Sequence, residues 1–181
     1  MTNPLSNSEQ LQQEARTRAT IIEELQERFS PKDEILDDAI ARARASNVPE
    51  IQVSPLLGKL LHTLALSCRA RKILEIGTLV GYSGTWLARS LPPGGKLISL
   101  EVNPRHAELA RTTFANAGMA ERVEVRVGSA LELLPTLVSE APFDLIFIDA
   151  DKESYPKYLE WSLKLSQPGS LIIADNMIQR G

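Results

Sequence analysis

The sequence contains one cysteine, so a disulfide bond within the chain is impossible. It also lacks any apolar run that approaches the roughly 18 residues of a membrane span, and residues 1–10 have no apolar core of the kind found in a signal peptide. Together these absences lead us to expect a cytoplasmic protein that does not contact a membrane. Cys68 follows an apolar helical pattern, where a packing role is more common than nucleophilic chemistry.

An excess of positive charge is also missing. The chain has 20 Lys and Arg against 23 Asp and Glu, a formal net charge of −3 and an isoelectric point near 5.5. A surface that binds nucleic acid needs clustered basic residues, so nucleic acid is not an expected partner. The only histidines, His62 and His106, are too far apart in the sequence to suggest metal-ligand spacing, and we expect both to be surface or helix-face residues.

Short apolar runs alternate with amphipathic stretches in the second half of the chain. The apolar runs that predict strands cover 72–76, 96–101, 122–127, 143–149 and 170–175, and helical patterns lie between them at 83–90, 104–117, 130–138 and 155–165. This alternation is typical of a doubly wound, mostly parallel α/β sheet.

Three helical patterns precede the first predicted strand. Residues 8–29 and 32–46 are amphipathic, and a third, strongly apolar helix is expected to begin after Ser54, which can act as an N-cap. We therefore expect an N-terminal helical segment, residues 1–50, that covers the site or forms a dimer contact, and a cofactor-binding domain, residues 51–181. The chain stops directly after the fifth predicted strand, so we expect this domain to be truncated at its C-terminus.

The first predicted strand leads into a glycine loop and then a helix, in the sequence ILEIGTLVGYS. Gly77 allows a ligand to approach the backbone closely. The loop has neither the G-x-G-x-x-G pattern of dinucleotide-binding proteins nor the G-K-[S/T] of a phosphate-binding loop, so the expected cofactor is not held through phosphates. Glu101 ends the next predicted strand, where a carboxylate can bind the ribose hydroxyls of a nucleoside. Small residues at 128–130 leave room for an adenine ring.

Acidic and amide side chains follow the last two predicted strands. Asp149 directly follows the apolar run 143–148, and Asp175 and Asn176 directly follow the apolar run 170–174. Because ligands bind outside the carboxyl ends of parallel strands, we expect these side chains to share one edge of the sheet. Two carboxylates and an amide oxygen suit a divalent cation such as magnesium. The alternative is that both aspartates serve only as N-caps of the segments that follow.

These motifs together resemble the class I S-adenosylmethionine-dependent methyltransferases, and more narrowly the cation-dependent O-methyltransferases of the caffeoyl-CoA and catechol O-methyltransferase group. The resemblance covers roughly residues 51–181 and is carried most specifically by FDLIFIDADK at 143–152 and by the Asp175-Asn176 pair. It implies transfer of a methyl group from S-adenosylmethionine to a hydroxyl of a catechol-like or phenylpropanoid small molecule, with magnesium, in a homodimer. Members of this group continue with two further strands and a substrate-contacting segment, which this sequence does not contain.

The resemblance also implies roles for individual residues. The cofactor would be bound by Ile51, Glu75, Gly77, Thr78, Ser83, Glu101, Ala130 and Asp149. The cation would be held by Asp149, Asp175 and Asn176. Lys152 would act as the general base beside Asp149, and Asp151 would contact substrate or cofactor.

Two other functions stay open at this point. A non-catalytic cofactor-binding or dimerisation module would retain the fold and lose turnover together with its C-terminal part. A nicotinamide-dependent oxidoreductase shares the βαβ pattern and the acid after the second strand, but it requires the G-x-G-x-x-G pattern that is absent here. The identity of the substrate, the choice of divalent metal and the oligomeric state are not determined by the sequence.

Overall fold

A computed structural model describes residues 7–177, and the chain divides into two compact units, Met1–Lys32 and Asp33–Gly181. The first unit contains α1 (Asn7–Phe29). The second contains every other element, including α2 (Glu34–Ala45), which contacts α5. The helical segment predicted as residues 1–50 is thus shared between the two units. Among the described residues, no helix combines the length and the apolar character needed to cross a bilayer.

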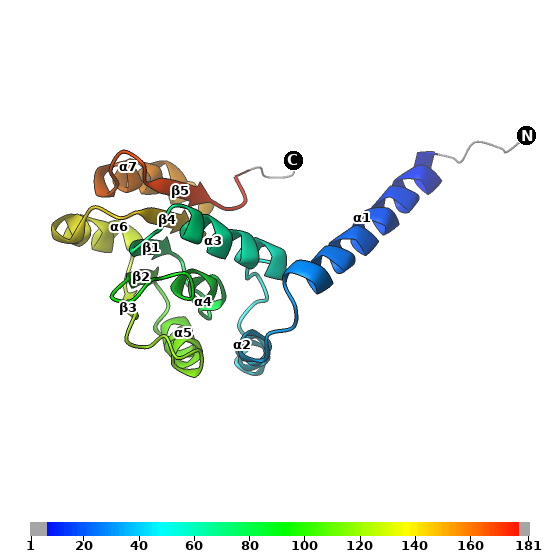
Figure 1. The fold of residues 1–181 in the computed structure, drawn as a ribbon, viewed down its shortest axis with the longest axis horizontal. Coiled ribbons are helices and arrows are strands. Elements are labelled where there is room, and N and C mark those ends of the chain that lie inside the picture. The colour runs from blue at the N-terminus through cyan, green and yellow to red at the C-terminus, as the bar shows by residue number, and fades with distance from the viewer. Residues whose placement is uncertain (1–6, 178–181) are drawn as a thin grey trace, which may run out of the picture. The chain divides into compact units, whose positions relative to one another are not determined.

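A five-stranded parallel sheet forms the centre of the second unit (Figure 1). Its strands are β1 (Lys72–Ile76), β2 (Lys96–Glu101), β3 (Val123–Val127), β4 (Leu145–Ile148) and β5 (Leu171–Ala174), in the spatial order β3-β2-β1-β4-β5. The predicted doubly wound parallel sheet is therefore confirmed. The strand order reverses beside β1, and in open sheets of this kind ligands bind at that point, outside the carboxyl ends of the strands.

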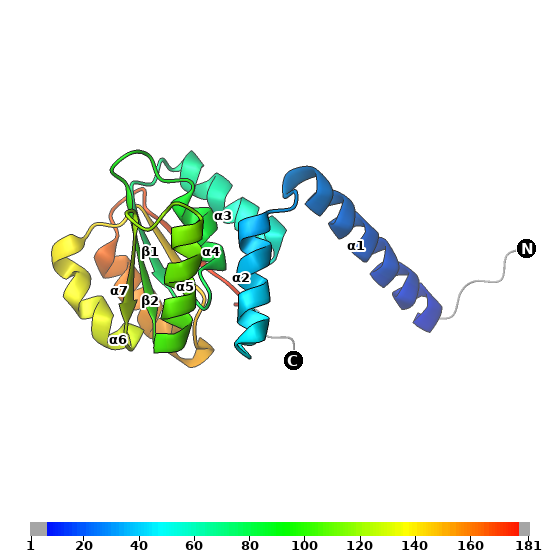
Figure 2. The ribbon, with the colours of Figure 1, turned by 90° about the horizontal axis from the view of Figure 1, so that it is seen from below.

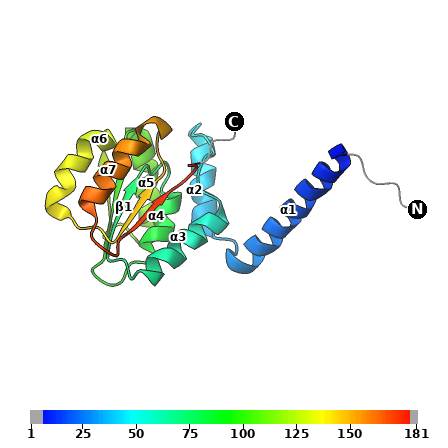
Figure 3. The same cartoon turned by 90° about the horizontal axis from the view of Figure 1, so that it is seen from above.

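Helices cover both faces of this sheet, as Figures 2 and 3 show. One face packs against α3 (Pro55–Ser67) and α4 (Tyr82–Ala88), with Leu61 and Leu87 in the same apolar cluster as Phe147 of β4. The other face packs against α7 (Tyr155–Leu165), where Tyr158 and Leu165 share a cluster with Ile146. Successive side chains of a strand point to opposite faces, so β1, β2 and β4 each contribute to both clusters. Helix α5 (Pro104–Asn116) packs along β3.

The helix predicted over residues 130–138 is wrong in its extent. The structure has a short helix α6 (Ala130–Leu133) followed by a 3-10 helix, η1 (Leu134–Glu140), with Pro135 at its start. Proline has no N–H group to donate to the preceding turn, so a continuous α-helix through this position would lose a backbone hydrogen bond. The strands predicted at 143–149 and 170–175 are also one or two residues shorter at each end, and Asp149 lies just beyond β4.

Candidate functional site

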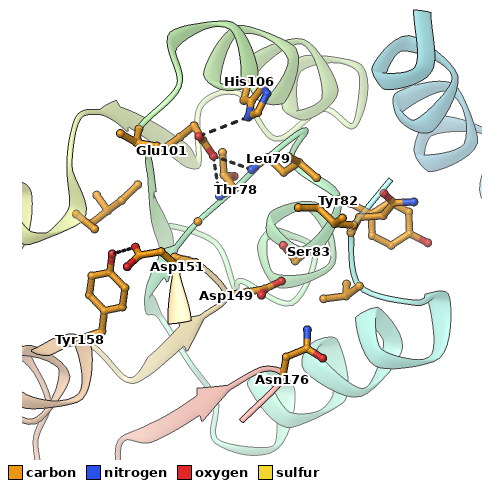
Figure 4. A pocket seen from close by; sticks show the side chains of 18 of the residues that line it. Thr78, Leu79, Tyr82, Ser83, Glu101, His106, Asp149, Asp151, Tyr158 and Asn176 are labelled. Atoms are coloured by element: carbon orange, nitrogen blue, oxygen red, sulfur yellow. Dashed lines mark hydrogen bonds and ion pairs between the residues drawn. The ribbon is translucent and has the colours of Figure 1, made fainter. Parts of the chain in front are cut away.

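A cavity of about 620 Å³ lies at the carboxyl end of the sheet in the second unit (Figure 4). Its lining comes from the segments that follow β1 to β5 and from the segment between α2 and α3. The lining includes most of the predicted site residues: Ile51, Gly77, Thr78, Ser83, Glu101, Ala130, Asp149, Asp151, Lys152 and Asn176. The structure therefore brings together, in one cavity, residues that the sequence spreads over more than a hundred positions.

The glycine loop approaches the backbone of the neighbouring strand too closely for a side chain. Ile76 pairs with Ile148 across β1 and β4, so Gly77 and Asp149 leave the sheet side by side. Gly77 has a φ of +93°, and a Cβ atom added there would lie 2.1 Å from the carbonyl oxygen of Asp149. Position 77 therefore requires glycine for two reasons: the positive φ disfavours other residues, and there is no room for a Cβ atom.

Replacing Gly77 by alanine is expected to destabilise the fold by about 3 kcal/mol or more, because a positive φ and a backbone overlap add together. Gly118→Ala is the matched control, since Gly118 has a φ of +69° and a Cβ atom added there would meet nothing within 4 Å. The control should lose only about 1 kcal/mol. Urea unfolding of both variants measures the difference, and equal losses would show that the close approach at Gly77 does not matter.

Glu101 is held firmly at the mouth of the loop. Its side chain accepts hydrogen bonds from the backbone N–H groups of Leu79 (2.9 Å), Thr78 (3.3 Å) and Asn103 (2.9 Å). His106 Nδ1 lies 3.7 Å from the same carboxylate, and both side chains line the cavity. Figure 4 shows the carboxylate directed at the loop backbone and flanked by His106. The carboxylate is thus fixed in position without a ligand.

Glu75 lies beneath the loop and is absent from the cavity lining, although the sequence placed it among the cofactor contacts. It is completely buried and accepts hydrogen bonds from the hydroxyls of Ser99 (2.5 Å), Ser83 (2.6 Å) and Thr78 (3.0 Å). Burial raises the pKa of Glu75 to about 7, while these hydroxyl groups oppose the rise. Glu75 therefore orients two cavity residues, Thr78 and Ser83, from below.

The raised pKa of Glu75 predicts a specific pH dependence of stability. The pKa is higher in the folded chain than the ordinary value of 4.5, so folding favours the protonated form. The contribution of protonated Glu75 to the free energy of unfolding is fully present below about pH 4.5 and is lost as the pH rises through about 7. Over that range the wild type should lose up to about 3 kcal/mol relative to Glu75→Gln. Urea unfolding of both proteins between these pH values measures this, and a constant difference would contradict it.

Asp149 and Asn176 reach into the same part of the cavity from the ends of β4 and β5 (Figure 4). Burial raises the pKa of Asp149, and the charge of nearby Asp175 adds to the rise, whereas Lys152 opposes it. Asn176 has a φ of +54°, a conformation that asparagine tolerates better than most residues. A site with two neighbouring carboxylates and an amide oxygen has the donor chemistry of a hard divalent cation.

Asp175 takes a different position from its two predicted partners. It does not line the cavity, and its Oδ2 accepts a hydrogen bond from Asn176 Nδ2 at 3.1 Å. Its backbone oxygen accepts hydrogen bonds from Lys152 Nζ (3.3 Å) and Tyr155 (3.0 Å). Within residues 7–177, no group of three or more His, Cys, Asp or Glu side chains is arranged to hold a metal ion. The predicted donor set has two carboxylates and depends on Asn176 for its third ligand.

Lys152 lines the cavity next to Asp149 and contacts two of the predicted metal ligands. Its Nζ donates to Asp149 Oδ1 at 3.2 Å and to the hydroxyl of Tyr155. Burial alone would lower the pKa of Lys152, but the hydrogen bonds to Tyr155 and Asp149 and the charge of Asp149 outweigh it and raise the pKa. The lysine is thus an ammonium group held beside a carboxylate.

His106 and Tyr158 are among the lining residues that the sequence did not indicate. His106, expected as a surface or helix-face residue, lies beside Glu101. Tyr158 packs in an apolar cluster, as its spacing from Tyr155 and Trp161 indicates, and its hydroxyl also donates a hydrogen bond to Asp151 in the cavity. Burial and this hydrogen bond raise the pKa of Tyr158 to about 12, so the tyrosine stays a donor. Only the spacing of Asp151 ahead of an aromatic helix could have indicated the second contact.

The chain is similar in sequence to known O-methyltransferases. A family model described as O-methyltransferase matches residues 26–181. A catechol O-methyltransferase of Niastella koreensis is 50% identical over 151 residues, which are 80% of this chain and 68% of that protein. A catechol O-methyltransferase of Mycobacterium tuberculosis is 49% identical over 149 residues, or 82% of this chain and 67% of that protein.

Solved structures are similar as well. The structure of an O-methyltransferase from Bacillus cereus in complex with SAH has a TM-score of 0.84 and 46% identity, covering 87% of this chain and 72% of that one. The O-methyltransferase TomG from Streptomyces achromogenes, involved in tomaymycin synthesis and solved in complex with SAM, has a TM-score of 0.83 and 45% identity, covering 87% and 71%.

Proposed function

The chain belongs to the O-methyltransferase family, and on this premise we propose that it transfers a methyl group from S-adenosylmethionine to a hydroxyl of a catechol-like or phenylpropanoid small molecule with the help of a divalent cation, magnesium being the best suited. The observation that carries the proposal is the cavity in which the glycine loop, Glu101 and the Asp149–Asn176 pair meet. The catechol O-methyltransferase names of two relatives support the substrate class.

The cofactor half of the cavity suits a nucleoside that carries no phosphate. Glu101 presents an anchored carboxylate for ribose hydroxyls, and the loop after β1 offers no phosphate-binding pattern. Two similar proteins were solved with SAM or SAH bound, which supports the same ligand here. The residues proposed to contact the cofactor are Ile51, Gly77, Thr78, Ser83, Glu101, Ala130 and Asp149, with Glu75 supporting Thr78 and Ser83.

The proposed ligands of a divalent cation are Asp149 and Asn176, which line the cavity, and Asp175, which lies beside them. Asp175 would have to turn its carboxylate away from Asn176 to join them. When bound, the cation would lower the pKa of a coordinated phenolic hydroxyl, which is near 10 in water. Few protein ligands leave open positions for two vicinal substrate oxygens.

Lys152 is proposed as the base that removes the proton from the acceptor hydroxyl. Its Nζ lies 3.2 Å from Asp149, beside the proposed acceptor position. Because the carboxylate of Asp149 favours the ammonium form, any ligand that neutralises this carboxylate lowers the pKa of Lys152 and favours the neutral form. Most of the acceleration should come from holding the acceptor oxygen in line with the methyl group.

We also propose a cytoplasmic homodimer, in which residues 51–181 form the cofactor-binding domain and residues 1–50 serve as its cover or dimer contact. The net charge of −3 supports a small-molecule acceptor over nucleic acid.

The proposed function is tested by incubating the protein with methyl-labelled S-adenosylmethionine and a panel of catechols. Labelled product should form with magnesium and disappear when a chelator is added. Mono-hydroxylated analogues of the same catechols provide the control, because they cannot chelate a cation through vicinal oxygens. Equal turnover with chelator would rule out the cation-dependent mechanism. Cofactor binding without turnover of any acceptor would favour a non-catalytic cofactor-binding module.

A further inference from the structure

Helix α1 carries an apolar stripe along one of its faces. Together with Arg18, its apolar side chains recur at alternating intervals of four and three residues, the spacing of the a and d positions of a coiled coil. The stripe consists of Leu11, Ala15, Ile22, Leu25 and Phe29, and Ile21 lies at its margin. Leu11 is 61% exposed and Phe29 is 56% exposed. The opposite face carries only polar residues: Gln13, Arg16, Thr17, Thr20, Glu23, Glu24 and Glu27.

An exposed helix with this pattern is far more stable with a partner. An isolated helix gains little from propensity alone, and its stability normally comes from burying the apolar face. The stripe is interrupted at one d position by Arg18, which is also exposed. A single charged residue in such a position determines which pairings are tolerated.

The stripe is complementary to itself when two copies run antiparallel. In the register that centres the pair near residue 20, Leu11 faces the partner's Phe29 and Ala15 faces the partner's Leu25. Each of these layers matches a larger side chain with a smaller one, which favours close packing. Arg18 then lies against the partner's Ile22, where its aliphatic stem can cover the isoleucine while its guanidinium reaches water.

Charges at the margin fit the same register. Glu14 and Arg28 both occupy g positions, and antiparallel pairing places Glu14 opposite the partner's Arg28 at each end of the pair. The remaining marginal positions bring Ile21 against the partner's Ile21 and Gln12 against the partner's Gln26. No like charges meet in this arrangement.

A parallel pair is much less favourable. It would place Arg18 directly against the partner's Arg18 in the middle of the apolar stripe, which buries two like charges together. It would also stack Phe29 on the partner's Phe29 and leave Ala15 facing the partner's Ala15, so that size complementarity is lost. Glu14 would then face an alanine instead of an arginine.

We propose that α1 is a dimerisation helix that pairs antiparallel with α1 of a second copy of this chain, in the register that joins Glu14 to the partner's Arg28. This inference deepens the proposed homodimer by naming its contact, and it does not depend on the proposed methyl transfer. Because the pairing is its own inverse, it closes with twofold symmetry and stops at two copies.

A charge exchange tests the register without disturbing the apolar stripe. Glu14→Arg and Arg28→Glu should each weaken the dimer by roughly tenfold, because each creates a like-charge pair at both ends. The double variant restores opposite charges and should return to within about twofold of the wild-type dissociation constant. Sedimentation equilibrium of the full chain measures all four proteins. Glu27→Arg, on the polar face, serves as the control and should leave the dissociation constant unchanged.

Cysteine cross-linking tests the direction of the helices. In a Cys68→Ser background, a cysteine at Ile21 should be joined to its copy by a short bismaleimide, whereas a cysteine at Leu11 should not, since antiparallel pairing separates the two copies of residue 11 by roughly 27 Å. Thr20→Cys, on the polar face, is the control that should not react. Strong cross-linking at Leu11 would overturn the antiparallel register.

Measuring the oligomeric state distinguishes an error in the proposed α1 contact from an error in the proposed homodimer. If the chain is a dimer and its dissociation constant is the same in both single charge variants as in the wild type, the role of α1 would be overturned while the homodimer would stand. A chain that remains monomeric at all concentrations would overturn both. Restoration by the double variant together with cross-linking at Ile21 would establish the antiparallel contact.

Discussion

Replacing Asp149 by asparagine is expected to lower kcat/KM for methyl transfer about a thousandfold, because the variant loses a charged ligand of the proposed cation and the carboxylate beside Lys152. The fold should survive, since burial already disfavours the ionised form of Asp149 and an amide fills nearly the same space. Initial rates against magnesium concentration, together with thermal unfolding, measure both effects.

Asp38→Asn provides the control for this substitution. Asp38 makes the same kind of carboxylate contact at the surface of α2, where it pairs with Arg42 and its side chain is 55% exposed. The control should keep wild-type rates and the wild-type response to magnesium. If Asp149→Asn retained more than about a tenth of wild-type kcat/KM at saturating magnesium, Asp149 would not be an essential metal ligand.

Replacing Glu101 by glutamine is expected to weaken S-adenosylmethionine binding by about tenfold to a hundredfold. The ionised carboxylate can bind ribose hydroxyls through charge-assisted hydrogen bonds, each worth about 1.5–3 kcal/mol. The glutamine amide would also direct an NH₂ group at a backbone N–H that now donates to Glu101. Calorimetric titration of the cofactor measures the loss, and the affinity for magnesium should not change.

Glu124→Gln is the matched control for the cofactor prediction. Glu124 is an exposed glutamate of β3 that pairs with Arg126 and lies outside the cavity. This variant should bind the cofactor as the wild type does. An unchanged cofactor dissociation constant in Glu101→Gln would show that the ribose does not contact this carboxylate.

The parallel sheet could be predicted from the sequence because its inner strands are buried on both faces and appear as uninterrupted apolar runs, as in Leu145–Ile148. The helix after β3 could not be predicted in the same way. Residues 130–138 have a helical apolar pattern, but the structure there changes to a 3-10 helix at Pro135. Pattern alone does not decide between two helical hydrogen-bonding schemes.

The candidate site shows a similar division. Gly77, Glu101 and Asp149 could be placed because each lies at or just beyond the carboxyl end of a strand, and parallel strands bring these ends to one edge. The buried position of Glu75 could not be predicted, because the hydroxyls of Ser83 and Ser99 that donate hydrogen bonds to its carboxylate lie on other elements. His106 and Tyr158 enter the cavity from α5 and α7, and local spacing carries no information about how those helices are oriented.

The most direct measurement is a calorimetric titration of the wild-type chain and of Asp149→Ala with S-adenosylmethionine and, separately, with magnesium. The proposed function predicts saturable binding of one cofactor per chain and a magnesium site in the wild type, with the magnesium site lost in the variant. Absence of cofactor binding to the wild type, or magnesium binding that is unchanged in Asp149→Ala, would contradict it.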